Sequence, residues 1–377
     1  MKKLIVFSLV FALVAGAVFA VDLTGGVYGH IDVVKGDSSK EGVNAGGSMD
    51  RLRLEGSGEL DEGKFGGWIR ADAPSLSIDD DFDFTDPDSD LNNLVNIDGF
   101  HGIAWWKPID QFKLSIGGNP DGVWGKEGVT GWMFNQDPYD SGVALNSGIW
   151  DEGEYGFFGS RYAFFGGFDA KGALLEIKPM EMLGINVAIP FISNAGKAED
   201  VFKATVAQLD LNFDFGNIAV TFDGGDDQGA IFAYFGGSFD ALDLDVGFGF
   251  HLKGEDEQDN RPIGLGLGLK YSADAFGIKF RTALSLPSAD TQDTGIKFDL
   301  LPYFAINDNI TAFLNMGLGM TMPKEGDATI GWLVNPYVRI GDKWGPSFYA
   351  GLQIWSDGVG DDPAVKWNVP ISIMVSF

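Results

Sequence analysis

The sequence predicts an all-β fold, a transmembrane antiparallel up-and-down β-barrel of eighteen strands, with sixteen or twenty strands as the alternatives. Three features of the chain predict it. Segments of about ten residues alternate apolar with polar side chains, the connections between them are short and long in turn, and the last segment also has one apolar face. Such alternation suits a sheet with lipid on one side and water on the other.

The first twenty residues have the pattern of a secretory signal peptide. Lys2 and Lys3 precede an apolar run from Leu4 to Phe19, and Ala20 supplies a small residue at the cleavage point. A membrane-anchoring helix is the alternative, but the run is shorter than the roughly 20 residues that span a bilayer, and no charged stop follows it. We therefore predict a signal peptide at residues 1–20 and one barrel at residues 21–377.

Alternation along the rest of the chain places the strands. The clearest segment sets Leu244, Val246 and Phe248 against Asp245 and Gly247. Burial on both faces would leave the aspartates of this segment without water or partners, so a wet interior is favoured. The predicted strands lie at 22–32, 51–60, 65–72, 99–107, 111–118, 170–178, 183–191, 201–213, 218–224, 229–239, 242–252, 263–271, 276–286, 295–304, 310–320, 329–340, 346–355 and 366–377.

Some segments leave this assignment open. Residues 119–169 contain aromatic pairs that could form further strands, which is why sixteen and twenty strands remain alternatives. Pro302, Pro336 and Pro370 fall inside predicted strands, where each removes a ladder hydrogen bond, so bulges or shifted strand ends are expected there. The polar residues 35–50 are predicted to form a loop.

Connection lengths are a second, independent sign of a barrel. Outer-membrane barrels have short periplasmic turns and long outer loops. Apolar-face aromatics cluster beside the short turns, as an interfacial girdle requires, and they are Phe65, Trp106, Phe112, Phe213, Phe239, Phe276 and Phe348. The short turns lie at 61–64, 107–111, 214–217, 240–241, 272–275, 307–309 and 341–345.

The last segment carries the most specific signal. Its apolar face consists of Trp367, Val369, Ile371, Ile373, Val375 and Phe377. A terminal alternating strand that ends on Phe resembles the C-terminal assembly signal of bacterial outer-membrane β-barrels, although Val375 stands where that family often has an aromatic residue. The resemblance implies insertion into outer-membrane lipid by the barrel assembly machinery.

Composition excludes several kinds of function. The chain has 54 acidic and 26 basic residues, a formal charge of −28, which argues against nucleic-acid binding. The absence of cysteine removes disulfides, thiolate metal sites and cysteine nucleophiles. Acidic residues at 86–90 resemble the start of a calcium loop, but Leu91 replaces the required Gly and Ile97 the bidentate Glu, so no metal site and no cofactor are predicted. Acidic loops should favour cations weakly at the mouth.

Residues 119–169 are predicted to be a functional loop, because a connection of this length in a compact domain usually has a function or folds onto another part of the protein. In its layout the mature chain resembles general porins, in which a long loop folds inward and its acidic groups face basic residues on the wall. The resemblance implies a constriction formed by Asp121, Glu127, Asp137, Asp140, Asp151, Glu152 and Glu154. The corresponding basic wall would be Arg51, Arg53, Arg70, Lys270, Lys279, Arg281 and Lys297, although each could equally be an ordinary charge in water.

These patterns favour a channel for passive diffusion of small hydrophilic solutes and ions, and not an enzyme. A homotrimer is consistent with the small residues on the outer face of the first strands. A surface adhesin or structural barrel is the alternative. An outer-membrane hydrolase is less favoured, because His30 and His251 lack an accompanying serine motif. A soluble β-sandwich explains the alternation but not the signal peptide or the short and long connections.

Overall fold

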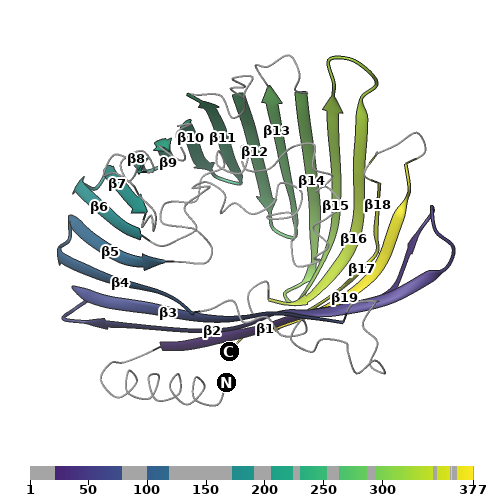
Figure 1. Ribbon diagram of the computed structural model, residues 1–377, viewed down its shortest axis with the longest axis horizontal. Coiled ribbons are helices and arrows are strands. Elements are labelled where there is room, and N and C mark those ends of the chain that lie inside the picture. The colour runs from purple at the N-terminus through teal and green to yellow at the C-terminus, as the bar shows by residue number, and fades with distance from the viewer. Residues whose placement is uncertain are drawn as a thin grey trace, which may run out of the picture.

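The computed structural model describes residues 22–78, 100–118, 172–190, 205–223, 230–252, 263–286, 294–342, 346–356, 358 and 363–376. All of its strands belong to one antiparallel sheet that closes on itself, because β1 (Asp22–Asp37) pairs with both β2 (Val43–Leu60) and β19 (Lys366–Ser376). Figure 1 shows the resulting ring of strands. Among the described residues, no helix is apolar and long enough to cross a membrane.

The predicted barrel of eighteen strands is confirmed. Nineteen segments make up the sheet, but β17 and β18 both pair with β16 and β19 and are two parts of one strand, interrupted at Leu352. The segments between those already named are β3 (Phe65–Ile78), β4 (Phe100–Ile109), β5 (Phe112–Gly118), β6 (Gly172–Met180), β7 (Leu183–Pro190), β8 (Val206–Phe213), β9 (Gly216–Asp223), β10 (Ala230–Phe239), β11 (Leu242–His251), β12 (Ile263–Ala273), β13 (Phe276–Leu286), β14 (Thr294–Asn307), β15 (Ile310–Met322), β16 (Thr329–Gly341), β17 (Ser347–Gly351) and β18 (Gln353–Ser356).

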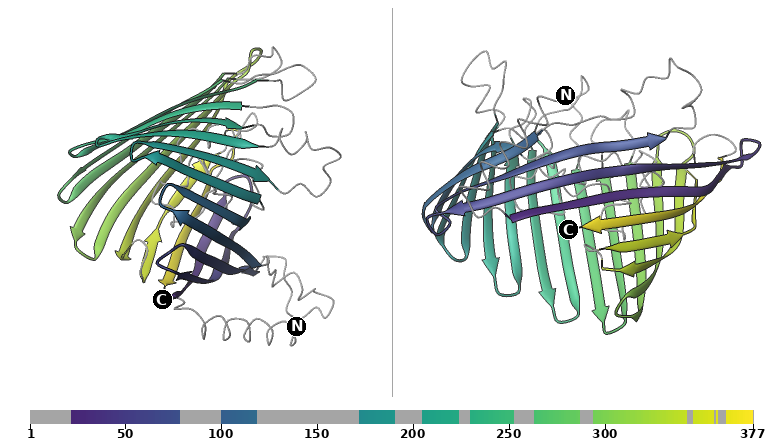
Figure 2. Two further views of the ribbon diagram at one scale, coloured as in Figure 1. Left: turned by 90° about the vertical axis from the view of Figure 1, so that its left-hand side faces the viewer. Right: turned by 90° about the horizontal axis from the view of Figure 1, so that it is seen from below.

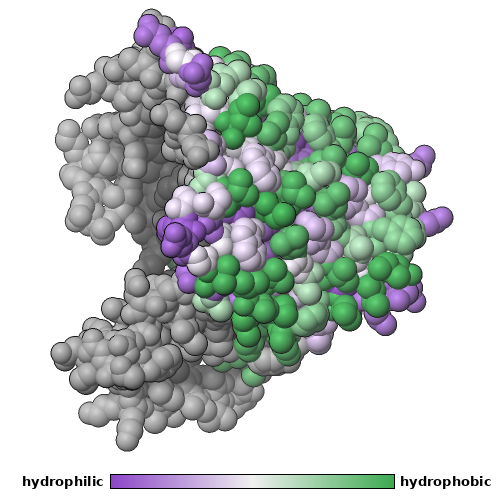
Figure 3. All heavy atoms as spheres, turned by 90° about the vertical axis from the view of Figure 1, so that its right-hand side faces the viewer, coloured by the Kyte–Doolittle hydropathy of each residue, from purple (hydrophilic) through white to green (hydrophobic). Residues whose placement is uncertain are grey.

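The two faces of the sheet differ as the alternation predicts. In β15, Thr311, Phe313 and Asn315 are buried toward the interior, whereas Leu318 faces outward and is 39% exposed. Directly paired residues share a face, so the register carries this division from strand to strand. Figure 3 shows apolar side chains over the described outer surface on one side of the barrel. An outer surface of this kind is stable in lipid and not in water.

The short turns predicted from the sequence gather at one rim of the barrel (Figure 2), whereas the turn between β1 and β2 lies at the other. Outward-facing aromatic rings lie beside them, as predicted for the girdle. Trp106 and Phe112 meet edge to face at 6.1 Å, and Phe215 stacks on Phe213 at 5.5 Å and lies 6.3 Å from Phe239. Amphipathic or aromatic groups at this level would mark the membrane interface.

The predicted loop at residues 35–50 was wrong. β1 continues to Asp37 and β2 begins at Val43, so only a tight turn separates them. The Asp37 carboxylate accepts hydrogen bonds from the backbone N–H of Ser39 at 2.8 Å and from its hydroxyl at 2.7 Å. Gly42 provides the positive φ of 96° at which the chain turns back.

Two of the three strand prolines mark irregular pairing. The Leu352 N–H donates to the Pro336 carbonyl at 3.0 Å, but Pro336 has no N–H to return the second bond of the pair, and the strand breaks there into β17 and β18. Pro370 lies at the bulge between β1 and β19, where the register shifts between Asp32 and Lys35. Pro302 shows no register shift toward β13.

The seam between the two ends of the barrel is long and well paired. Ten residue pairs join β1 to β19. Beyond them, the Ser38 N–H donates to the Val365 carbonyl at 2.9 Å, and the Val365 N–H donates to the Ser38 hydroxyl at 2.8 Å. The predicted signal peptide, the acidic segment at 86–90, Phe377 and the long loop at 119–169 lie outside the described residues.

Candidate functional site

The inner face of β11 to β14 carries a mixed basic and acidic cluster. Lys270 lies directly opposite Lys279, and Arg281 directly opposite Asp299. The Lys270 ammonium contacts the Asp243 carboxylate at 3.0 Å. Two lysines side by side would repel one another, and the neighbouring carboxylates offset that repulsion. Lys297 also faces inward and is only 2% exposed.

A row of aromatic rings crosses the same wall near the short turns. Tyr303, Phe313, Tyr337 and Tyr349 occupy successive strands, with ring centroids 5.9, 4.7 and 6.4 Å apart. The Arg339 guanidinium lies 5.5 Å from the centre of the Phe313 ring. A cavity of about 740 Å³ borders this row and is lined by Lys270, Lys279, Arg339, Asp274, Asp308 and their neighbours.

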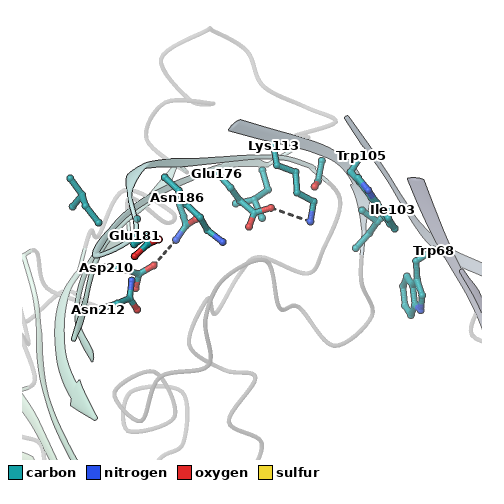
Figure 4. Close-up of a pocket in the computed structure, with 14 residues that line it drawn as sticks. Trp68, Ile103, Trp105, Lys113, Glu176, Glu181, Asn186, Asp210 and Asn212 are labelled. Carbon is teal, nitrogen blue, oxygen red and sulfur yellow. Dashed lines mark hydrogen bonds and ion pairs between the residues drawn. The ribbon is translucent and has the colours of Figure 1, made fainter. Parts of the chain in front are cut away.

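A second cavity, of about 570 Å³, lies on the inner face of β3 to β8 (Figure 4). Trp68, Ile103 and Trp105 form its apolar end. Lys113 stands between this end and the polar one, with its ammonium 5.3 Å from the Trp105 ring centre and 3.3 Å from the Glu176 carboxylate.

Asp210 organises the polar end of this cavity. Its carboxylate is 1% exposed and accepts hydrogen bonds from the side-chain amides of Asn186 and Gln208, both at 2.8 Å. Gln208 in turn accepts a bond from the Thr221 hydroxyl at 3.2 Å. A buried carboxylate is tolerated because charged hydrogen bonds replace its water. The network fixes the orientation of both amides.

A third cavity, of about 540 Å³, adjoins the second at the short-turn rim, where Glu59, Glu62 and Lys107 contribute to its lining. In the turn between β4 and β5, the hydrogen bond and charge of Lys107, at 2.9 Å, hold the pKa of Asp110 below its ordinary value. Within the described residues, no group of three or more His, Cys, Asp or Glu side chains is placed to hold a metal ion.

The two walls lie across the barrel from one another. In a ring of eighteen strands, eight strands lie between β5 and β14 in either direction, and Figure 1 shows them on opposite sides. The two adjoining cavities of the β3 to β8 wall are lined by six acidic and three basic residues. The cavity of the β12 to β16 wall has three basic and two acidic residues. The walls therefore differ in charge balance.

The structure places part of the predicted site. Lys270, Lys279, Arg281 and Lys297 come together at inward positions of β12 to β14. Arg51, Arg53 and Arg70 are described only by their place in the sheet, with Arg53 opposite Asp72 and Arg70 opposite Glu55. The seven acidic residues predicted for the constriction lie outside the described residues.

The predicted assembly strand forms β19 and closes the barrel. Trp367, Val369 and Ile371 lie on its outer face, followed by Ile373 and Val375, which are 54% and 43% exposed. The pattern that suggested the assembly signal is therefore an outward apolar face.

Sequence reasoning missed the inward aromatic residues and the Asp210 network. Four of these aromatic residues stand at alternating positions that are otherwise polar in their strands and that face the lumen: Trp105, Tyr303, Phe313 and Tyr337. Side chains in a strand alternate between its two faces, so an aromatic residue at one of these positions faces the lumen and not the lipid. Their inward direction could therefore have been predicted from the sequence. The hydrogen bonds around Asp210 join strands β7 to β9 and required the register.

No family model and no curated protein matches the sequence. Solved structures do match. OpdL of Pseudomonas aeruginosa has a TM-score of 0.56 and 10% identity over 95% of this chain and 98% of that chain. The anion-selective porin from Comamonas acidovorans has a TM-score of 0.52 and 10% identity over 94% of this chain and 99% of that chain. A loop-deleted form of OmpT, an outer membrane protein of Vibrio cholerae, has a TM-score of 0.52 and 12% identity over 95% of this chain and 99% of that chain.

At these identities the likeness concerns the fold. It extends over nearly the whole of each chain, and it agrees with the closed sheet, the apolar outer face and the short turns at one rim. Proteins of this fold span the bacterial outer membrane. The chain is therefore a porin-like β-barrel of the outer-membrane type, built from eighteen antiparallel strands.

Proposed function

We propose that this protein is an outer-membrane channel through which small hydrophilic solutes and ions diffuse passively. The observation that supports this most directly is the lining of the barrel, where charged side chains and cavities occupy two opposite walls. A barrel with a purely structural role needs no charges inside, because apolar packing would stabilise its interior at lower desolvation cost.

The unequal charge balance of the walls supports a mechanism of selection. A solute between β3 to β8 and β12 to β16 would experience a field across its path, with the more basic wall on one side and the more acidic wall on the other. Excess acid on the first wall and in the whole chain would favour cations weakly. Residues 119–169 would narrow the path further and set its size limit.

Single-channel recording of the refolded mature protein in a planar bilayer tests the proposal. We expect stable conductance steps, a reversal potential in a KCl gradient with the sign of weak cation preference, and larger steps after deletion of most of residues 119–169. Insertion of folded protein without any conduction would overturn the channel and leave a surface adhesin as the function to test. Unchanged steps after the deletion would overturn only the constriction.

Association into trimers is a separate proposal. Gly25, Gly56 and Gly58 lie on the outer face of β1 and β2, where they leave that surface flat and allow close approach in lipid. Cross-linking in lipid vesicles should give a trimeric product that Gly58→Phe abolishes, with Val246→Phe on the outer face of β11, where the side chain is 41% exposed, as the control.

A further inference from the structure

We propose that the cavity on the inner face of β3 to β8 binds small neutral saccharides during their passage. This inference rests on the proposed channel and adds the class of solute. The cavity measures about 570 Å³, within the range of roughly 300 to 1,000 Å³ that is usual for small-molecule sites. It joins an aromatic end to an amide and carboxylate end, and each end has a separate role.

The aromatic end offers a flat apolar surface toward the lumen. Figure 4 shows Trp68 projecting from the wall beside Ile103 and Trp105. Trp105 is held flat, because its ring lies over Gly66, where a Cβ would stand 2.7 Å from the indole nitrogen. Trp68 is only partly buried and remains accessible from the interior. The C–H face of a pyranose ring packs on such an indole and buries apolar area that water would otherwise cover.

The polar end supplies oriented hydrogen-bonding groups. One N–H of the Asn186 amide is committed to Asp210, which fixes the direction of the second N–H and of the carbonyl oxygen. The second N–H and the carbonyl oxygen of Asn186 can both bond to a sugar hydroxyl, because a hydroxyl can donate one hydrogen bond and accept another. Gly184 leaves room for the buried Asp210 side chain, since a Cβ there would lie 3.3 Å from Asp210 Cβ and would push Asp210 away from Asn186.

The charges of the cavity favour a neutral solute over a charged one. Lys113 and Glu176 already neutralise one another at 3.3 Å, and the charge of Asp210 is satisfied by two amides. The two other charged lining residues, Lys178 and Glu181, have opposite signs and are exposed at the β6–β7 turn. Beside the aromatic end, an anion would have to compete with Glu176 for Lys113, and a cation would have to displace Lys113 from both Glu176 and the Trp105 ring. A neutral saccharide displaces neither Lys113 nor Glu176, so it can bind without breaking the ion pair between them.

Maltose is the probe for the test, with gluconate and glucosamine as the charged comparisons. Binding is measured in two ways on the refolded protein: tryptophan fluorescence in detergent micelles, which needs no conduction, and current block in planar bilayers. We expect maltose to change both signals in the millimolar range. Trp68→Ala should weaken binding about tenfold or more, and Asn186→Ala about fivefold, the size of one net hydrogen bond.

The controls separate this site from the channel and from folding. Trp355→Phe changes another inward tryptophan, on β18, and should leave maltose binding unchanged. Trp68→Phe retains an aromatic ring, and it should bind maltose more weakly than wild type and more tightly than Trp68→Ala. It replaces Trp68→Ala in the test if that variant does not fold. Conduction without maltose block or fluorescence change overturns the site and leaves the channel. Fluorescence binding without conduction overturns the channel and leaves the site. Gluconate or glucosamine binding as tightly as maltose overturns the neutral class.

Discussion

Gly277 on β13 is predicted to hold the Tyr303 ring of β14 against the wall. The two residues are directly paired, and a Cβ at Gly277 would lie 2.5 Å from Tyr303 Cε1, where ordinary contacts are 3.4–4 Å. In Gly277→Ala the ring therefore has to move by about 1 Å or more, into the adjoining cavity. This displacement removes the contact that keeps the ring flat.

The cost follows from what the ring gives up. Its hydroxyl shares a hydrogen bond with Ser272 at 3.1 Å, worth about 0.5–1.5 kcal/mol. Its ring lies 5.9 Å from Phe313, and such aromatic pairs contribute about 0.5–1.5 kcal/mol. Replacing glycine by alanine should return about 0.4–1 kcal/mol by restricting the unfolded chain. The central values of these three ranges give a net loss of about 1 kcal/mol, measured by urea unfolding in lipid vesicles, and we also expect a smaller single-channel conductance.

A matched glycine and a double variant test this reasoning. A Cβ at the outward-facing Gly67 would meet only the Ile103 carbonyl at 3.5 Å, so Gly67→Ala should be neutral or slightly stabilising. In a Tyr303→Ala background the penalty of Gly277→Ala should disappear. A penalty that persists without the Tyr303 ring would refute the contact as its cause.

Three further changes have defined outcomes. Pro336→Ala restores an N–H opposite the Leu352 carbonyl, and new amide protection is expected at the substituted position. The hydrogen bond gained, about 0.5–1.5 kcal/mol, is largely offset by a cost of about 0.4–1 kcal/mol from the freer unfolded chain, so the net gain in urea unfolding should be below about 1 kcal/mol. Lys279→Gln removes an inward positive charge and should raise the cation-to-anion permeability ratio about fourfold, because a unit charge roughly 10 Å from the ion path in water acts with opposite sign on cations and anions, by about 0.4 kcal/mol each. Because the folded pKa of Asp110 is lowered by Lys107, its contribution to stability is present above the ordinary value of 3.8 and lost as the pH falls through the folded pKa, so Asp110→Asn should differ from wild type only above that range.

Each of these expectations has an outcome that contradicts it. An unprotected amide at position 336 in Pro336→Ala would mean that the strand break has another cause. Lys64→Gln, at an exposed turn, is the control for Lys279→Gln, and an equal effect of both would remove the lumen charge from the explanation. A stability difference for Asp110→Asn that persists at the lowest pH would exclude the ion pair as its source.

Much of the barrel is predictable because lipid imposes a strict rule on alternation. In β11 the outward Leu244, Val246 and Phe248 were placed correctly by side-chain period alone, since one residue of slip would put Asp245 into lipid. The rule fails where the faces look alike. Residues 35–50 are largely polar on both faces, so the hydrophobic pattern does not mark them as strand. They form the end of the β1 to β2 hairpin, which is held by backbone pairing between the two strands.

The candidate site is less predictable, because the lumen accepts many kinds of side chain. Alternation assigned Lys270 and Arg281 to the inner face, but it could not show that Asp299 lies opposite Arg281. Likewise, Asp210 reaches Asn186 across the β7 and β8 register, 24 residues away in sequence. Such contacts depend on how strands are paired, and the sequence pattern fixes only which face each residue has.

The seam at Ser38 and Val365 sets a kinetic order for assembly. These residues are 327 positions apart, whereas every other strand pairing joins neighbours in the chain. Closing a loop of that length costs about 5 kcal/mol in chain entropy, and a hairpin with a tight turn costs only about 1 kcal/mol. The hairpins should therefore form first, and the union of β1 with β19 should limit the rate at which the ring is completed. Until then both terminal strands expose unpaired edges, so this chain depends most on protection from aggregation during its final step.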